Sequence, residues 1–374
     1  MFNDMMQSLL SAIYPLLEKE FNLTFGQVGL MTFAFQVTAS ILQPLVGMIT
    51  DKHPQPRSLA VGMGSTFCGV LMLAIAQEFT FLLVGAMLIG VGSAIFHPES
   101  SRVARVASGG KFGTAQSIFQ LGGNFGQALG PLMAAFIVVP LGRPSVALFS
   151  IIALTGSVIL YRIGVWAEGR RKAAVKSNAP MAPRHGYSRA RVGWTIAILA
   201  MLVFSKNIYT ASITSYYTFF LIERFGLTIQ QSQLMLFLFM AAMAAGVVLG
   251  GLVGDRIGPL RVIWFSILGV LPFTLMLPHV GLAMTGVLTV VIGLILSSAF
   301  PAIVVYAQEL VPGRVGMIAG LFFGFAFGMG GIAAAILGEV AEYKGLAFVY
   351  QLCSFMPAIG LLAILLPRGF GRRH

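Results

Sequence analysis

Four ionisable side chains lie within long apolar stretches of this sequence, namely Asp4, His97, Glu99 and Lys206. Burying a charge away from water is costly, so such groups usually bind a ligand, carry a proton or pair with one another. A carboxyl or imidazole group can take up and release protons, whereas an ammonium group attracts anions. We therefore interpret the two acids and the histidine as proton-coupling candidates. Lys206 is the main candidate for binding an anionic substrate.

Each of these candidates has a structural alternative. A buried ammonium group needs an anionic partner, and for Lys206 that partner is either a fixed Asp4 carboxylate or a bound substrate. We favour the substrate, with a pair to Asp4 that could open when substrate arrives. His97 could instead be a hydrogen-bonded histidine beside a helix-kinking proline. Glu99 could simply pair with Arg102, three residues further along the same helix.

Uncharged polar residues at helical spacing could line the same pathway. Amide side chains form one stripe in the fifth apolar stretch, and tyrosines cluster in the seventh. Each of these groups also has a structural alternative. The amides could form interhelical hydrogen bonds, the tyrosines could belong to an interfacial aromatic belt, and Arg102 could anchor its helix at the cytoplasmic surface. The substrate-binding candidates that accompany Lys206 are Gln7, Gln120, Asn124, Asn207, Tyr209, Tyr217 and Arg102.

Composition indicates that these residues lie in a membrane. The 374 residues are 57% hydrophobic and only 10% charged, whereas a soluble domain has about 25% charged residues. This balance argues against a soluble enzyme, a nucleic-acid binder and a disordered chain. About 20 apolar residues cross a bilayer as a helix. We expect twelve spans, at about residues 2–17, 25–50, 58–77, 79–101, 112–139, 144–166, 192–222, 229–254, 259–278, 281–308, 315–340 and 345–366.

The net charge of +12 is distributed unevenly. Most of the 24 Lys and Arg fall in alternate predicted loops, and loops of this kind stay in the cytoplasm. We therefore predict a multi-pass protein of the cell (inner) membrane with both termini cytoplasmic, and no nucleic-acid partner. Cys68 and Cys353 lie in apolar spans and indicate neither a disulfide nor a metal site. The first span is short, so we expect residues upstream of Met1 to belong to it as well.

An internal repeat divides the chain. At an offset of 204 residues, Asn3 falls on Asn207, and the sequence Phe-Asn-Leu-Thr at 21–24 matches Phe-Gly-Leu-Thr at 225–228. Six spans in each half give both halves the same orientation, as in transporters built from parallel repeats. We predict an all-α membrane protein with twelve transmembrane helices in two pseudo-symmetric six-helix bundles. The predicted domains are residues 1–167 and 191–374, joined by a polar, basic cytoplasmic linker at 168–190.

The repeat is sharpest at Gly47-Met-Ile-Thr-Asp51-Lys52 and at Gly251-Leu-Val-Gly-Asp255-Arg256. These segments resemble the signature between spans two and three of the major facilitator superfamily and its echo in the second half. The resemblance implies a gate that holds the two halves together on the cytoplasmic side. In the first copy, His-Pro-Gln-Pro at 53–56 replaces the usual glycine and basic run. The gating candidates are Gly47, Asp51, Arg57, Gly251, Asp255, Arg256 and Arg261.

A closer resemblance runs through residues 95–126, with the Asn-Asp at 3–4 and the Ser-Lys-Asn at 205–207. These segments are similar to the fosmidomycin resistance branch of the superfamily. The resemblance implies proton-coupled export of small organic anions or drugs, with fosmidomycin-like phosphonates as the substrate class. It also implies alternating access, a monomer in the lipid bilayer, and no cofactor because the proton gradient supplies the energy.

Three other functions compete with export. The same fold serves proton-coupled uptake of a sugar phosphate or carboxylate. A non-transporting membrane sensor or scaffold is a second alternative, and it would need no central polar cavity. A membrane enzyme is disfavoured, because the sequence contains no Walker loop, nucleophile elbow or metal-ligand spacing.

Overall fold

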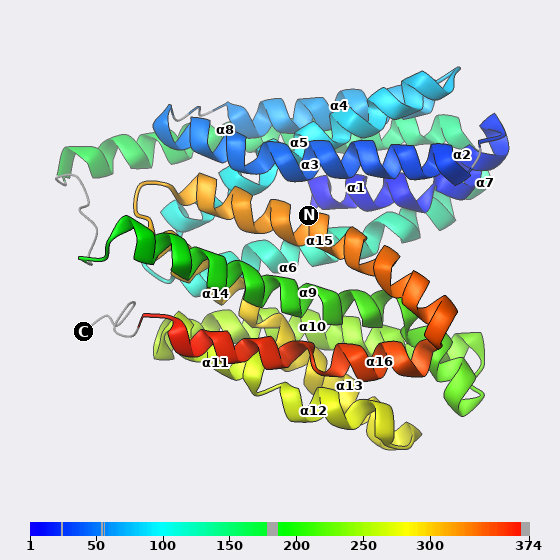
Figure 1. Cartoon of the computed structure of the whole chain (residues 1–374). Helices are drawn as coiled ribbons and strands as arrows, with labels where there is room; N and C mark the ends of the chain where they lie inside the picture. Colours follow the sequence, from blue (N-terminus) through cyan, green and yellow to red (C-terminus); the bar gives the residue numbers. More distant parts are fainter. Residues whose placement is uncertain (24, 54, 56, 178–185, 368–374) are drawn as a thin grey trace. The chain divides into compact units, whose positions relative to one another are not determined.

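The computed structural model describes residues 1–23, 25–53, 55, 57–177 and 186–367, and within these ranges the chain forms helices and short connections (Figure 1). The helices are α1 Phe2–Ala12, α2 Tyr14–Phe21, α3 Phe25–Lys52, α4 Ser58–Ile75, α5 Phe79–Ala107, α6 Phe112–Met133, η1 Ala134–Val138, α7 Val139–Leu141, η2 Arg143–Val146, α8 Ala147–Ser177, α9 Arg189–Phe225, α10 Ile229–Ile257, α11 Pro259–Leu268, α12 Leu271–Met276, η3 Leu277–His279, α13 Leu282–Ser297, α14 Ala299–Leu310, α15 Val315–Lys344, α16 Leu346–Ser354 and η4 Met356–Leu365.

Eleven segments in the described ranges are long and apolar enough to cross a membrane, and they coincide with the predicted spans from 25–50 onward. The prediction of an all-helical multi-pass membrane protein is therefore confirmed. The predicted span at 2–17 is instead two short helices, α1 and α2, which meet at Ile13. The last helix before the predicted linker is longer than expected, because α8 continues to Ser177. Linker residues 178–185 lie outside the described ranges.

Prolines set the breaks inside several spans. A proline lacks the N–H group and crowds the preceding turn, so a helix tends to end just before it. Accordingly, α12 begins one residue before Pro272, α14 begins two residues before Pro301, and η4 begins one residue before Pro357. The break between α13 and α14 turns a single predicted span, 281–308, into two helices with separate packing faces. Phe300, in the first turn of α14, is placed by this break.

The chain divides into two compact units. Unit 1 comprises Met1–Gly110, Phe119–Ala182 and Pro312–Gly324, and unit 2 comprises Lys111–Ile118, Pro183–Val311 and Phe325–His374. Each unit thus contains most of one predicted half together with the beginning of one helix from the other half. The exchanged pieces are the beginning of α6, in unit 2, and the beginning of α15, in unit 1.

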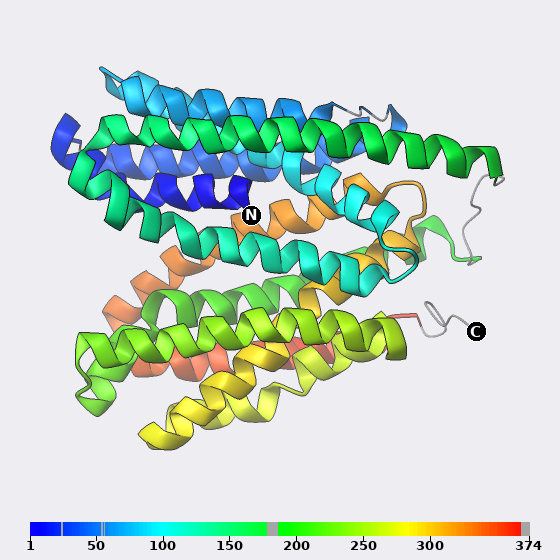
Figure 2. The ribbon, with the colours of Figure 1, turned by 180° about the vertical axis from the view of Figure 1, so that it is seen from behind.

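The same neighbours recur inside each unit. In unit 1, α5 packs against α3 and α4, and α4 packs against α8, which lie side by side in both views (Figures 1 and 2). In unit 2, the corresponding pairs are α10 with α13, α11 with α14, and α11 with η4. Each unit has its own apolar core, centred on Met6, Leu82 and Phe149 in unit 1 and on Phe220, Phe239 and Ile292 in unit 2. The repeat in the sequence is therefore a repeat in the packing.

Candidate functional site

Lys206 lies near the middle of α9 in unit 2, in a long helix that begins at the capping side chain of Ser188. The residue is only 9% exposed. Its Nζ lies 5.2 Å from the centroid of the Phe300 ring, a distance at which an aromatic face attracts a cation. Within unit 2, as far as the structure describes it, no carboxylate lies within 4.0 Å of Nζ. An aromatic face compensates only part of the cost of a buried ammonium group, so an anion would be bound favourably here.

Two polar residues lie close to Lys206 along α9. The Tyr209 side chain is buried, and its hydroxyl has no hydrogen-bond partner among the residues that the structure describes. It lies three residues from Lys206, on the same side of the helix. Asn207 Nδ2 donates to the backbone oxygen of Ala326 at 3.4 Å. Tyr217, in contrast, is fully buried in the core, and its hydroxyl forms a hydrogen bond with the Thr289 hydroxyl. The structure therefore gives Tyr209 a spare hydrogen-bonding group and Tyr217 a packing role.

A second polar cluster surrounds Asp4 in unit 1. Asp4 Oδ1 lies 3.5 Å from His97 Nε2, and Oδ2 lies 3.4 Å from the Met1 amino group. Both side chains are almost fully buried. The His97 ring stacks on Phe323 with centroids 5.0 Å apart. This contact fixes the plane of the imidazole, so the pair with Asp4 is held in one geometry.

Amide groups on α1 and α6 have unused hydrogen-bonding capacity. Asn3 Oδ1 accepts a 3.4 Å hydrogen bond from Thr66, but Asn3 Nδ2 has no partner in the described part of the chain. Gln7 Nε2 and Gln120 Oε1 are also buried without a partner. Helix α6 reaches Asp4 at Gly123, where an added Cβ would lie 3.6 Å from Oδ1. Asn124, the next residue on α6, is half-buried.

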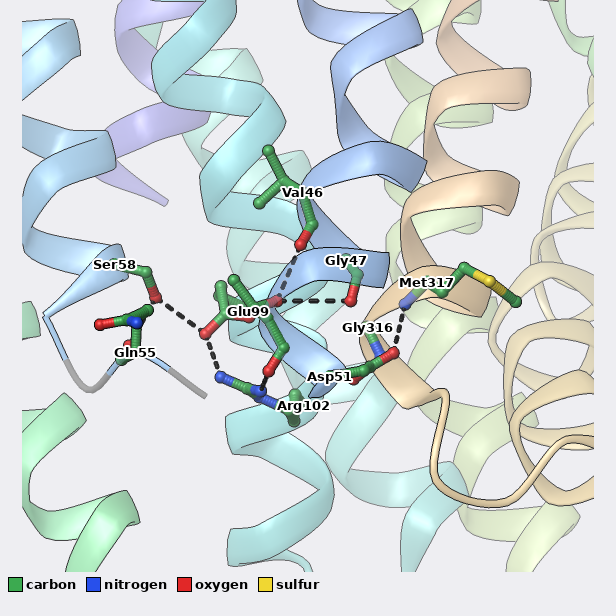
Figure 3. A network of polar contacts seen from close by, with 10 residues as sticks. Val46, Gly47, Asp51, Gln55, Ser58, Glu99, Arg102, Gly316 and Met317 are labelled. Atoms are coloured by element: carbon green, nitrogen blue, oxygen red, sulfur yellow. Dashed lines mark hydrogen bonds and ion pairs between the residues drawn. The ribbon is translucent and has the colours of Figure 1, made fainter. Parts of the chain in front are cut away.

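Glu99 and Arg102 form the ion pair that their spacing predicts (Figure 3). Glu99 Oε2 also accepts a 2.8 Å hydrogen bond from Ser58, at the start of α4. Arg102 Nη1 donates to the backbone oxygen of Thr50, near the end of α3. The pair therefore links the ends of three helices, and its two side chains are already engaged.

The Asp51 carboxylate binds the beginning of α15, far away in the sequence (Figure 3). Oδ1 accepts a 2.9 Å hydrogen bond from Gly316 N, and Oδ2 accepts a 2.8 Å bond from Met317 N. These are the second and third N–H groups of the helix, which an N-cap side chain normally binds. The residue that precedes α15 is Arg314, whose side chain cannot accept a hydrogen bond and so cannot cap the helix. Asp51 thus caps a helix from a distant part of the chain.

Asp255 does the same for α6 within unit 2. It accepts 2.8 Å bonds from the N–H groups of Gly113 and Thr114 and a 2.6 Å bond from the Thr114 hydroxyl. These N–H groups again belong to the second and third residues of the helix. The residue before the helix is Lys111, whose side chain cannot accept a hydrogen bond. The two contacts are equivalent under the 204-residue repeat, since Asp51 corresponds to Asp255.

Glycines permit both contacts. A Cβ at Gly47 would lie 2.6 Å from the backbone nitrogen of Met317, and a Cβ at Gly251 would lie 2.7 Å from the backbone oxygen of Gly113. Real Cβ atoms do not approach backbone atoms so closely, so both sites require glycine. Of the basic gating candidates, Arg57 lies over the Tyr161 ring at 5.9 Å, while Arg256 and Arg261 are exposed.

The structure thus brings the predicted residues together in two groups. Asp4, His97 and Gln7 share one cluster in unit 1, and Lys206 and Tyr209 share one helix face in unit 2. A pair between Asp4 and Lys206 would join the two units and stays a prediction. The sequence analysis did not identify Phe300, Phe323, Thr66 or Ser58. Their roles depend on contacts between helices, which a single sequence does not show.

Comparison with known proteins supplies the last observations. A family model described as Major Facilitator Superfamily matches residues 1–335. The fosmidomycin resistance protein of Escherichia coli is 55% identical over 98% of this chain and 90% of that protein. A Bacillus subtilis protein described as the uncharacterized MFS-type transporter YfnC is 40% identical over 98% of this chain and 90% of its own length. The crystal structure of the Escherichia coli fucose:proton symporter FucP has a TM-score of 0.75 at 15% identity, covering 98% of this chain and 97% of that one. The predicted resemblance and fold class are confirmed.

Proposed function

Because this chain belongs to the major facilitator superfamily, we propose that it is a proton-coupled exporter of small organic anions, with fosmidomycin-like phosphonates as the substrate class. The family members and structural neighbours found are transporters, and the name of the 55% identical relative refers to fosmidomycin resistance. A phosphonate is an oxyanion, which an ammonium group binds well. The proposed substrate therefore matches the charge of the buried candidate residue.

The observation that carries the proposal is the state of Lys206. Its ammonium group is buried beside Phe300 and has no carboxylate partner within the described part of unit 2. A phosphonate oxygen would provide the missing anion, and the Tyr209 hydroxyl would donate a hydrogen bond to a second oxygen. Asn207 would contact the rest of the substrate. Tyr217 is left out of the proposed site because its hydroxyl is bonded to Thr289.

We place the coupled proton on the Asp4 and His97 pair. The two groups are 3.5 Å apart and buried, and Asn3 and Gln7, on the same helix as Asp4, have amide groups without a partner among the described residues. Protonation of Asp4 would remove its attraction for a charged His97 and change how α1 contacts α5. Glu99 is a weaker candidate because Arg102 and Ser58 already hold its charged form.

Alternating access would use the two Asp caps as locks. We propose that residues 1–167 and 191–374 are the moving bundles, as the repeat predicts. In that division, the contacts of Asp51 with α15 and of Asp255 with α6 each connect one bundle with the other. Both contacts are formed in the present state. Opening on their side of the membrane would require both caps to release.

Transport of radiolabelled fosmidomycin into inside-out membrane vesicles tests the proposal. With an acidic lumen, an exporter that exchanges protons for drug accumulates the drug inside, and a proton ionophore collapses the accumulation. Lys206→Gln should abolish the uptake. Lys344→Gln, which removes an exposed lysine at the end of α15, is the matched control and should leave it intact.

The outcomes separate the competing functions. Drug uptake that does not respond to the ionophore would contradict proton coupling. Drug movement in the same direction as the protons would indicate a symporter. Absence of fosmidomycin flux in vesicles that contain folded protein would favour a different substrate or a non-transporting sensor.

A further inference from the structure

Three phenylalanine rings lie around His97 in unit 1. The Phe323 ring, from α15, is almost parallel to the imidazole, with an interplanar angle of 18° and centroids 5.0 Å apart. Phe96, next to His97 on α5, and Phe119, on α6, meet the imidazole at angles of 77° and 69°, with centroids 5.6 and 6.1 Å away. The Phe119 ring also makes an edge contact with Phe323, at 5.8 Å between centroids. Of the three rings, Phe323 is therefore the one that stacks face to face on His97.

Phe323 reaches His97 because the first turns of α15 lie directly on α3. The Asp51 carboxylate, at the end of α3, binds two N–H groups in the first turn of α15. Further along, an added Cβ at Gly324 would overlap the backbone oxygen of Ser40, so the two helix backbones are in contact there as well. Phe323 is the residue before Gly324. Because α15 carries this ring, the stack on His97 is made only when α15 is docked on α3.

A stacked ring acts differently on the two protonation states of an imidazole. The face of an aromatic ring is electron-rich and attracts a cation within about 6 Å of its centroid, most strongly where water is excluded. His97 and Phe323 are each only 3% exposed, so a protonated His97 has this attraction in a dry setting. A neutral imidazole gains ordinary packing contacts alone. The Phe323 ring therefore favours the protonated form of His97.

Few charged groups lie near His97. From α1, the Asp4 carboxylate is 3.5 Å from Nε2, with the Met1 amino group on its other oxygen. On α5 itself, Glu99 is paired with Arg102. Helices α4 and α6 contain no acidic or basic residue, those of α3 and α15 lie in the last turns of each helix, and the first on α8 is the exposed Arg162. Asp4 and the Phe323 ring are thus the neighbours that favour a charge on His97.

We propose that Phe323 is a positioning residue of the transport cycle: its ring face stabilises protonated His97 and so links proton uptake to the docking of α15 on α3. This inference rests on the proposed proton site at Asp4 and His97. Because coupling between two equilibria is reciprocal, a proton on His97 favours the docked α15, and docking of α15 favours the proton. The Asp51 cap and the His97 stack then hold the same helix, and only the stack depends on the proton.

Fluorinated phenylalanines at position 323 test the proposal. Each added fluorine makes the ring face less electron-rich and hardly changes its size, so packing is preserved. The measurement is 15N NMR of the imidazole nitrogens of the full-length protein in nanodiscs, with His97→Gln to identify the His97 signal. From phenylalanine to 3,4,5-trifluorophenylalanine, the titration midpoint of His97 should fall by about one pH unit, a tenfold loss of proton affinity. The same series at Phe322, the fully buried neighbour on α15, is the matched control and should leave the midpoint unchanged.

Asp51→Ala tests the link to docking. Because this substitution weakens the hold of α3 on α15, the fluorine series at position 323 should shift the His97 midpoint less in this background than in the wild type. A shift of the same size in both backgrounds would show that the stack does not depend on docking, and would overturn the proposal. Equal midpoints throughout the series, or equal shifts at positions 322 and 323, would also overturn it, since the ring would then only fill space. The titration needs no drug, so such a failure leaves the proposed export through Lys206 untouched, and an absence of fosmidomycin flux leaves the titration interpretable.

Discussion

Replacing Asp51 with alanine should open the interface between α3 and α15. In the present state the carboxylate accepts two hydrogen bonds, of 2.9 and 2.8 Å, from the first turn of α15. Alanine removes both acceptors. When the interface opens, water binds the same N–H groups, so the open state loses nothing from the substitution. The change therefore acts almost entirely on the closed state.

The size of the effect follows from these two bonds. A hydrogen bond to a charged group contributes about 1.5–3 kcal/mol net, and the lower end is appropriate because Asp51 is only half-buried. Two bonds then give about 3 kcal/mol, which corresponds to a shift of about 150-fold towards the open state. An asparagine side chain at this position would retain one good acceptor, so Asp51→Asn should shift the equilibrium only about tenfold.

Gln43 reports the opening. It lies two turns before Asp51 on α3, is fully buried, and is covered by α15 at Gly320, where an added Cβ would lie 2.6 Å from the Gln43 carbonyl carbon. We would place Gln43→Cys in a background without the two native cysteines, and measure its labelling rate by a membrane-impermeant maleimide. The rate should rise in the order wild type, Asp51→Asn, Asp51→Ala. Glu78→Ala, an exposed acid outside the interface, should have no effect.

Equal labelling rates in the three proteins would refute the argument, because they would mean that the cap does not hold the interface closed. A rise in Asp51→Asn as large as that in Asp51→Ala would also contradict it. That result would indicate that charge alone, and not the two directed hydrogen bonds, stabilises the closed state.

Three further predictions concern other parts of the molecule. Lys206→Gln should keep its thermal stability or gain some, because it removes a buried charge that the Phe300 ring compensates only in part, yet it should lose fosmidomycin binding. Differential scanning fluorimetry and equilibrium binding measure the two properties. His97→Gln should retain exchange of labelled for unlabelled drug but lose net accumulation driven by a pH gradient, since exchange requires no net proton transfer. Gly251→Val should lower the melting temperature, with an overpacking cost of about 1–3 kcal/mol, because its Cβ would lie 2.6 Å from that of Ser117. An unchanged melting temperature would show that α6 and α10 can separate freely at this point.

Much of the fold was predictable from the sequence, because hydrophobic length alone determines where a helix can cross a membrane. The predicted spans at 58–77, 79–101 and 112–139 begin at the residues where α4, α5 and α6 begin. Their ends were less accurate: α4 ends at Ile75 and α6 at Met133, before the predicted ends, whereas α5 continues to Ala107 because a helix can extend into water beyond its apolar part. The last turns of α5 carry Arg102 and Arg105, and α8 extends through basic residues to Ser177.

The candidate site was only partly predictable. Lys206 and Asp4 stood out because each is a rare charged group in an apolar stretch. Their partners did not, since the Phe300 ring beside Lys206 and the Phe323 ring beside His97 are two among 30 phenylalanines. A charge in an apolar helix is visible in one sequence, whereas the neighbour that contacts it is a property of how distant helices pack. The Glu99 and Arg102 pair was visible because both residues belong to one helix.

The two Asp caps explain why the motif residues occur at the ends of α3 and α10 and not within them. Helices α9 and α10 begin with their own capping side chains, Ser188 and Thr228. Helices α6 and α15 are preceded instead by Lys111 and Arg314, which cannot accept a hydrogen bond. Their first turns are capped by a distant aspartate, which binds N–H groups that would otherwise need water or another acceptor. In the transport cycle that we propose, closing each interface and completing the cap of a helix would therefore be the same event. Because each contact consists of only two or three hydrogen bonds, we expect it to be strong enough to favour one state and weak enough to break during that cycle.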